Sequence, residues 1–572
     1  MIDNPQFLDS PTKPSASRRH DLDALRAGAM VLGICLHGMM AYSGIPWVVM
    51  DNERSGALEN AINLIHGFRM PLFFLVSGYF TAMLACRRGW AGMLGNRAGR
   101  ILTPLLVCMI TIIPLNKTVE FLALKENASH PHGRIFEAIS EEDPGKVLKI
   151  LEGGPSSQIE EPEKRMRLTP LAWAVLCESE PMTRLLLEQG ANPMALSQMG
   201  LSPLSTAALL GRVELIKLLL KKGGDPFSSR MYEKSAWKAA NLSLNETQGL
   251  LLVSRGKMPP DLAALEQGRR ETIKLLSGLS MEKYGTLVPP EPGDSISPNR
   301  NIPHWLSWYF AWLASDNNVL KLGGLEINLV QDNTLEHLWF LWFLWWLCLI
   351  YAGASWLANL TGLRMTENKS YMFPGLLVAF VLTCCLQALM NLDYHPTTLQ
   401  TKMGPDFSPG FIPKPHVFLY YAIFFFFGGW YFKLGDDQCR LGNFWWVVLP
   451  LALVVIFPMI LSLGEQRLPN ILLQAIFTWL MTLGAMGLAN KLFQKESKVF
   501  RYLADSAYWL YLAHIPVVIF MQWQLLHVQL PAWLKFMLVL LVSMPVLLAS
   551  YGLLVRRTVI GRILNGKTHG KD

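Results

Sequence analysis

A charged stretch leads directly into the first long apolar segment of the chain: RRHDLDALR (residues 18–26) is followed by AGAMVLGICLHGMMAYSGI (residues 27–45). On a helix, Arg26 and His37 lie about three turns and roughly 16 Å apart along the axis, so they share one face. Asp23 joins that face because it precedes Arg26 by one turn. Ionisable side chains in a segment that can enter a bilayer indicate a functional site. The alternative is a helix with basic anchors and a histidine that packs against its neighbours.

The composition indicates a polytopic membrane protein with a soluble part attached. Of the 572 residues, 51% are hydrophobic and only 16% are charged, and the chain is too long for one ordinary domain. Residues 1–17 are polar and contain prolines, so the first span is expected to direct its own insertion. The eight cysteines show no metal spacing and no disulfide framework, so we expect no metal site. The net charge of +8 lies beside apolar segments, which argues against a nucleic-acid partner.

About ten apolar segments are expected to cross the bilayer as helices, which predicts an all-α bundle. They are residues 24–45, 61–85, 101–115, 338–357, 371–390, 417–432, 444–463, 471–488, 507–521 and 532–555. Arginine and lysine concentrate in alternate connections, most clearly in the link between Arg87 and Arg100, which contains no acidic residue. By the positive-inside rule, both termini are expected to be cytoplasmic.

The connection between the third and fourth spans contains an internal repeat. LTPLAWA (residues 168–174) recurs thirty-three residues later as LSPLSTA (residues 201–207), and each copy precedes an amphipathic helix that ends in a glycine turn. The pattern resembles the ankyrin repeat, although Ala172 and Ser205 replace its histidine. Degenerate repeat units precede these two copies at residues 134–163 and follow them at residues 235–256 and 261–276. We therefore expect a short soluble α-solenoid on the external face, with a protein or a glycan as its partner.

Three further motifs place polar side chains at or inside predicted spans. IHGFRMPLFFLVSGYF (residues 65–80) puts His66 and Arg69 one turn apart, with Ser77 deeper in the span. EHLWFL (residues 336–341) carries His337, and SAYWLYLAHIP (residues 506–516) carries His514. Taken singly, such groups can cap backbone groups, anchor at the interface or allow close helix packing. Together, four histidines and two arginines in or beside spans favour a functional site.

With these four motifs in this order, the sequence resembles the membrane-bound acyltransferase type 3 family, in particular its glucan-biosynthesis (succinyltransferase) branch. The resemblance covers about residues 18–115 and 335–556, and the ankyrin-like insert departs from the family pattern. It implies a bacterial inner-membrane enzyme without a bound cofactor. The enzyme would move a succinyl or acetyl group from cytoplasmic acyl-CoA to a hydroxyl of a periplasmic or surface glycan.

The residue types suit that chemistry. A sugar hydroxyl is a poor nucleophile at neutral pH, and a histidine is a suitable general base, so His37 is assigned that role. Arg26 is expected to hold a CoA phosphate or the thioester side of the reaction, and Asp23 to orient Arg26. Arg97 and Arg100 suit the nucleotide phosphates of CoA, and the equal alternative is that they only anchor the cytoplasmic end.

The remaining motif residues are assigned to substrate binding. Arg69 with His66 is expected to recognise an acyl carboxylate or to stabilise the tetrahedral oxyanion. His337 and His514 belong to the same substrate-binding set. A covalent acyl-enzyme through Ser77 is an open alternative, although the sequence shows no partner base.

The sequence divides the chain into six parts: a polar segment (1–17), the first membrane part (18–126), the insert (127–288), a tether (289–334), the second membrane part (335–556) and a basic tail (557–572). Two other functions were weighed against acyl transfer. A proton-coupled transporter would also need intramembrane ionisable groups, but no repeat relates the two halves. A membrane-anchored ankyrin binding protein would leave the polar motifs of the spans unexplained.

Overall fold

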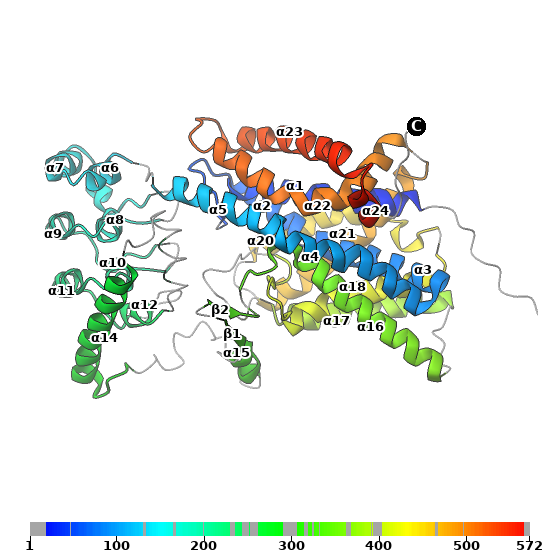
Figure 1. Ribbon diagram of the computed structural model, residues 1–572, viewed down its shortest axis with the longest axis horizontal. Helices are drawn as coiled ribbons and strands as arrows, with labels where there is room; N and C mark the ends of the chain where they lie inside the picture. Colours follow the sequence, from blue (N-terminus) through cyan, green and yellow to red (C-terminus); the bar gives the residue numbers. More distant parts are fainter. Residues whose placement is uncertain are drawn as a thin grey trace, which may run out of the picture.

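The computed structural model describes residues 19–45, 47–129, 133–163, 167–197, 200–228, 235–242, 247, 251, 261–289, 306–313, 318–322, 325–330, 332–361, 368–390, 392, 403–436, 438–463, 467–495 and 497–565. The predicted N-terminal segment, half of the tether and the end of the basic tail lie outside these residues. Among the described residues, only β1 (Val319–Leu322) and β2 (Leu325–Asn328) form a sheet, an antiparallel pair. The prediction of an all-α bundle with a helical insert is confirmed (Figure 1).

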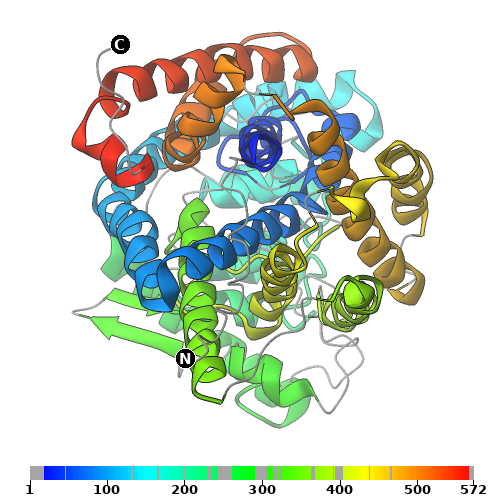
Figure 2. The same ribbon diagram turned by 90° about the vertical axis from the view of Figure 1, so that its right-hand side faces the viewer.

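Long apolar helices run side by side and form the membrane part. Its main helices are α1 (His20–Met40), α3 (Arg69–Arg97), α16 (Trp339–Thr361), α17 (Met372–Gln387), α18 (Pro415–Lys433), α21 (Arg467–Leu492), α22 (Lys498–Gln524) and α23 (Ala532–Ser550). Within the described part of the chain, eight helical stretches are long and apolar enough to cross a membrane. In the end-on view of Figure 2, α1 lies among the other helices. It packs against α3, α21, α22, α23 and the short helix α2 (Gly56–His66).

One of these eight stretches, Gly56–Ile110, contains two predicted spans joined by a tight turn. Gly89 has φ +70°, a conformation that glycine adopts without a steric penalty. The chain reverses there, because Arg97 Nη2 reaches back to donate a hydrogen bond to Thr81 Oγ1 at 3.2 Å. The helical segment after this turn continues through α4 (Thr103–Ile110). With α18, a nineteen-residue helix outside the eight, the described helices accommodate all ten predicted spans.

Small residues bring α3 and α18 into close contact. A Cβ atom on Gly78 would lie 1.8 Å from the carbonyl oxygen of Phe425, and one on Gly428 would lie 1.9 Å from that of Leu75. Helices in membranes commonly approach through such residues, because dispersion contacts improve as the backbones come closer. Gly78 therefore has the packing role that the sequence left as its alternative.

The insert is a stack of short helix pairs at one end of the bundle (Figure 1). The pairs are α6 (Arg134–Ser140) with α7 (Pro144–Gly153), α8 (Pro170–Leu176) with α9 (Glu180–Glu188), and α10 (Pro203–Leu209) with α11 (Val213–Lys221); α12 (Ala236–Ala240) and α14 (Leu262–Tyr284) follow. The Thr169 hydroxyl accepts a hydrogen bond from the amide of Ala172 and caps α8. Ser202 and Ser205 form a capping box on α10, so the replacement of the repeat's histidine by Ser205 still satisfies the helix end.

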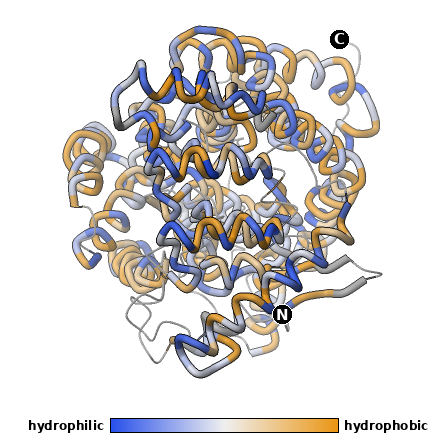
Figure 3. Tube along the Cα trace, turned by 90° about the vertical axis from the view of Figure 1, so that its left-hand side faces the viewer, coloured by the Kyte–Doolittle hydropathy of each residue, from blue (hydrophilic) through white to orange (hydrophobic). Residues whose placement is uncertain are grey.

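Each helix of the insert has an apolar side in the stack and a polar side toward solvent. Figure 3 faces this end and shows both kinds of residue along each helix. Leu171, Leu186, Leu204 and Leu219 are fully buried in one continuous core. The helix α5 (Ile112–Ser129) connects this stack to the bundle (Figure 1). Among the described residues, a helix therefore precedes the insert on its N-terminal side.

The close approach of α3 and α18 predicts that Gly78→Ala destabilises the protein. The added methyl group meets a backbone carbonyl that cannot rotate away, so the helices must separate, at a cost of about 1–3 kcal/mol. We expect a lower apparent melting temperature for the purified protein in detergent. Gly353→Ala in α16 is the control, because a Cβ atom there meets no atom within 4 Å. Equal melting temperatures for the two variants would contradict the packing argument.

Candidate functional site

One face of α1 lines two cavities in succession. Asp23, Arg26 and Met30 line a larger cavity of about 530 Å³ toward the N-terminal end of the helix. Met30, Gly33 and His37 line a smaller cavity of about 130 Å³ toward its C-terminal end. These five residues recur every three or four positions, which is the spacing of one helix face. The face predicted from Arg26 and His37 therefore runs along both cavities.

The two cavities adjoin inside the bundle. Met30, Phe340 and Tyr511 belong to the lining of both. Helices α1, α16 and α22 contribute these side chains, so the junction forms only when three segments distant in the sequence pack together. The two cavities are therefore neighbours that share these three side chains in their walls.

A hydrogen-bonded pair of histidines lies at the smaller cavity. His37 Nδ1 is 2.9 Å from His514 Nε2. His514 Nδ1 lies 2.8 Å from the carbonyl oxygen of Tyr511 and 3.1 Å from that of Leu510, and a carbonyl can only accept. In the neutral ring His514 Nδ1 must therefore carry the proton, and its Nε2 accepts one from His37 Nδ1. This leaves His37 Nε2 unprotonated, which is the state that a general base requires.

Two further side chains fix the ring of His37. Its imidazole stacks on the indole of Trp47, with the ring centroids 5.8 Å apart. Trp47 Nε1 donates to Gln522 Oε1 at 2.9 Å, and Gln522 Nε2 donates to the carbonyl of His37 at 2.8 Å. The sequence motifs gave no sign of Trp47 or Gln522, because neither lies within a quoted motif and both act through long-range contacts.

Arg69 lies across α1 at Gly33. A Cβ atom on Gly33 would lie 2.0 Å from a guanidinium nitrogen of Arg69, so only glycine leaves space for this side chain. Among the described residues no carboxylate lies within ion-pair distance of Arg69, and its Nε has no hydrogen-bond partner. A cation left without a counter-ion inside a bundle is suited to hold an anion or a developing negative charge.

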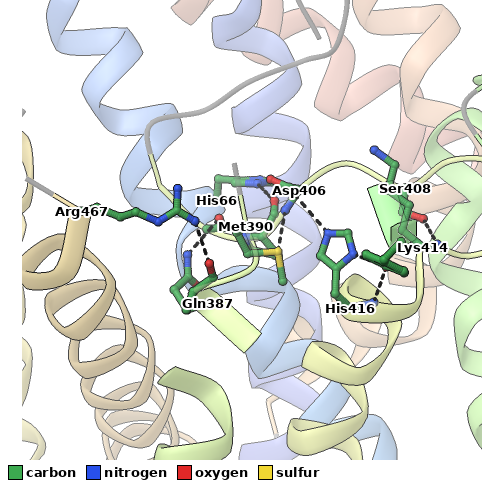
Figure 4. A network of polar contacts seen from close by, with 12 residues as sticks. His66, Gln387, Met390, Asp406, Ser408, Lys414, His416 and Arg467 are labelled. Atoms are coloured by element: carbon green, nitrogen blue, oxygen red, sulfur yellow. Dashed lines mark hydrogen bonds and ion pairs between the residues drawn. The ribbon is translucent and has the colours of Figure 1, made fainter. Parts of the chain in front are cut away.

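His337 is in the smaller cavity, whereas His66 is not among its lining residues. His337 Nε2 donates to the carbonyl of Leu512 at 3.0 Å, since a carbonyl only accepts, and its Nδ1 has no partner among the described residues. His66 Nε2 donates to the carbonyl of Pro405 at 3.1 Å. Figure 4 shows His66 beside Asp406, in a network that also includes His416 and Arg467. The hydrogen bond from His66 to Pro405 thus holds the segment after residue 403 against the bundle.

The larger cavity is rich in arginine. Arg26, Arg97, Arg100 and Arg501 line it together with Asp23 and Asp505, so cationic side chains outnumber anionic ones. Arg26 forms an ion pair with Asp23 at 3.5 Å, and Arg97 Nε has no partner among the described residues. Guanidinium groups in excess favour an anionic ligand with phosphate or carboxylate groups. The sequence motifs gave Arg501 no role.

Ser77 also lines the larger cavity. No contact between its hydroxyl and a histidine or carboxylate is found in the described part of the chain, so no base activates it there. The structure therefore brings together His37, Arg69, His337 and His514 at one cavity and places Asp23, Arg26, Ser77, Arg97 and Arg100 at the other. Among the described residues, no three histidine, cysteine, aspartate or glutamate side chains converge as metal ligands.

Two relatives resemble the chain over a limited stretch. It is 38% identical over 113 residues to the Glucans biosynthesis protein C of Shigella dysenteriae serotype 1 (strain Sd197) and to that of Escherichia coli (strain K12). The matched stretch is 19% of this chain and 28% of each relative, so it spans little more than a quarter of their length.

Two family profiles match the chain. Ankyrin repeats (three copies) match residues 135–229, which are the helix pairs α6 to α11. The acyltransferase domain matches residues 19–138 and 296–554, two blocks that flank the insert and include every side chain of both cavities except Leu564. Because these blocks make up more than half of the chain, the protein belongs to the acyltransferase domain family and is a membrane acyltransferase interrupted by ankyrin repeats.

Proposed function

We propose that the protein transfers a succinyl or acetyl group from acyl-CoA to a hydroxyl of a periplasmic or surface glycan. The observation that carries this proposal is the junction of the two cavities at Met30, Phe340 and Tyr511. A thioester in the larger cavity would reach the junction from one end of the bundle, and an acceptor hydroxyl in the smaller cavity would reach it from the other.

The larger cavity suits acyl-CoA by its charge. CoA carries phosphate groups, and forked guanidinium groups bind phosphate oxygens through paired hydrogen bonds. Arg97 and Arg100 would bind the nucleotide phosphates, and Arg26, held by Asp23, would lie nearer the thioester. Acyl-CoA is a co-substrate in this proposal, and the reaction needs no resident cofactor.

His37 would act as the general base. Its Nε2 takes the proton of the acceptor hydroxyl while the hydroxyl oxygen forms a bond to the thioester carbonyl carbon. When the tetrahedral intermediate collapses, the C–S bond breaks and the proton on His37 passes to the departing CoA thiolate. His514 would keep the ring of His37 in the tautomer that leaves Nε2 free. General base catalysis of this kind contributes about 10²–10⁴-fold to a rate.

Arg69 would stabilise negative charge on the substrate. The tetrahedral intermediate places that charge on the former carbonyl oxygen. The guanidinium across Gly33, which has no ion-pair partner among the described residues, is in place before the reaction begins. With a succinyl donor, the terminal carboxylate is a second group that Arg69 can bind. Direct transfer is favoured over an acyl-enzyme, because the described contacts give Ser77 no base.

For location, we propose the bacterial inner membrane with both termini in the cytoplasm and the insert outside. Helix α3, which contains the turn at Gly89, reaches the end of the bundle opposite the insert (Figure 1). Ankyrin stacks present an extended surface for binding, so a protein or glycan partner at the insert completes the proposal.

His37→Ala is expected to abolish acyl transfer, with a loss of about 10²–10⁴-fold in kcat, because it removes the general base of the proposed mechanism. The measurement is release of free CoA thiol in the presence of a glycan acceptor, with the full-length protein in lipid nanodiscs. His527→Ala is the control, since His527 is 52% exposed and lies outside both cavities. Normal transfer by a well-folded His37→Ala protein would remove His37 from the mechanism.

Gly33→Ala tests the position of Arg69. The methyl group would occupy the place of a guanidinium nitrogen, so Arg69 must move away from the reaction centre. We expect a loss of about 10²-fold in kcat, comparable to the loss of one oxyanion donor, with acyl-CoA affinity retained. Gly28→Ala on the same helix meets no atom within 4 Å and should behave as wild type. Full activity of Gly33→Ala would show that the position of Arg69 is unimportant for transfer.

The topology predicts which surface cysteines react from outside. In a background without the exposed Cys86 and Cys385, Glu188→Cys in the insert should be labelled by a membrane-impermeant maleimide in cells whose outer membrane is permeabilised. Lys498→Cys, at the start of α22, should react only after the inner membrane is opened. The reverse pattern would place the insert in the cytoplasm.

A further inference from the structure

A polar cluster on the helix that leads to the insert forms one wall of the smaller cavity. Asn116 and Glu120 of α5 line this cavity together with Glu336, which begins the short 3-10 helix (Glu336–Leu338) before α16. None of the sequence motifs assigned a role to these three residues. They face the space that also contains His37, Arg69 and His337.

The cluster is held in a fixed arrangement. Asn116 Nδ2 donates to Glu336 Oε2 and, at 3.0 Å, to Glu120 Oε1. Lys117 Nζ forms ion pairs with Glu336 Oε1 at 2.7 Å and with Glu120 Oε2 at 3.0 Å. Glu336 is 4% exposed, and a buried carboxylate is retained only when such partners hold it.

Some polar atoms of the cluster and of the cavity lining lack hydrogen-bond partners among the described residues. Asn116 is 1% exposed, yet its Oδ1 has no hydrogen-bond partner among the described residues. Arg69 Nε and His337 Nδ1, from the same cavity lining, also have none. Asn116 Oδ1 and the unprotonated His337 Nδ1 are acceptors and Arg69 Nε is a donor, so a ligand with several hydroxyl groups, which both donate and accept, would recover the free energy that these unmet groups cost.

The remaining lining fits the same kind of ligand. The aromatic rings of Trp47, Trp339 and Tyr511 offer flat apolar surfaces, against which the C–H face of a sugar ring can pack. Two carboxylates and one ammonium group give the Asn116–Glu336 side of the cavity a net negative charge. At this side of the cavity, as distinct from the Arg69 side chain, that charge disfavours an anionic group of the acceptor and leaves a neutral one unaffected.

We infer that Asn116, Glu120 and Glu336 form an acceptor subsite that selects an uncharged, hydroxyl-rich sugar residue and places its reacting hydroxyl at His37. The inference rests on the proposed function and deepens it by naming the class of acceptor. Asn116 Oδ1 accepts a hydrogen bond from one sugar hydroxyl, and the carboxylates accept from its neighbours. Because Asn116 and Glu120 lie on α5, the helix that precedes the insert also contributes to the choice of acceptor.

The test compares two acceptors with the full-length protein in lipid nanodiscs. One is a pool of neutral glucose oligosaccharides, and the other is the same pool oxidised at the primary hydroxyls to carboxylates. With succinyl-CoA or acetyl-CoA as donor, Asn116→Ala should raise KM for the neutral acceptor about tenfold, the usual effect of one lost hydrogen bond. KM for acyl-CoA and kcat should stay within about twofold of wild type. Thr118→Ala, on the exposed side of α5, is the matched control.

Glu336→Gln provides a readout that a purely structural role would not move. Removing one negative charge should lower the preference for the neutral over the oxidised acceptor by about tenfold or more. Unchanged KM values and an unchanged preference in both variants would overturn the inference, as would a wild-type protein that prefers the oxidised pool. A wild-type protein that transfers from acyl-CoA to neither pool would overturn the proposed function and the inference together.

Discussion

The site depends on the burial of a single cation, the guanidinium of Arg69, against the backbone of α1 at Gly33. An arginine in a bilayer is tolerated only when it faces the interior of the protein. Gly33 supplies the space, and the hairpin that turns at Gly89 brings α3 beside both α1 and α18. The close packing of Gly78 on α18 fixes that position. Stability and site geometry therefore both depend on α3, which packs against α18 at Gly78 and against α1 at Arg69.

The direction of the hydrogen bond between His37 and His514 is fixed, because backbone carbonyl groups accept a hydrogen bond from the other ring nitrogen of His514. The carbonyls of Leu510 and Tyr511 can only accept, which sets the proton on His514 Nδ1 and, through it, the proton on His37 Nδ1. No carboxylate is needed to orient the base. Backbone carbonyls avoid a second buried charge, because a carboxylate inside the bundle would itself need a partner.

The two cavities differ in the charge that they present. Arginines dominate the larger one, and the smaller one combines Arg69 with the Glu120–Glu336 side. Such a division suits a reaction between an anionic donor and a neutral acceptor. The insert lies close to this arrangement in the sequence, because α5 has Asn116 near its N-terminal end and the ankyrin stack follows its C-terminal end (Figure 1). A third cavity, of about 830 Å³, lies between the first repeat, near Phe136, and the loop around His527.

The sequence by itself determined the features that repeat locally. Hydropathy predicted the spans, the thirty-three-residue period predicted the solenoid, and helical spacing placed Asp23, Arg26 and His37 on one face. Their roles in catalysis remain predictions. Only the tertiary structure decided which distant residues join that face. His37 and His514 are 477 positions apart, and no local pattern encodes such a contact. For the same reason Trp47, Gln522, Asn116 and Arg501 went unassigned, and His66, one turn from Arg69, was grouped with it although its ring binds the Pro405 carbonyl. Periodicity fixes the direction of a side chain around its own helix, whereas packing determines what it meets there.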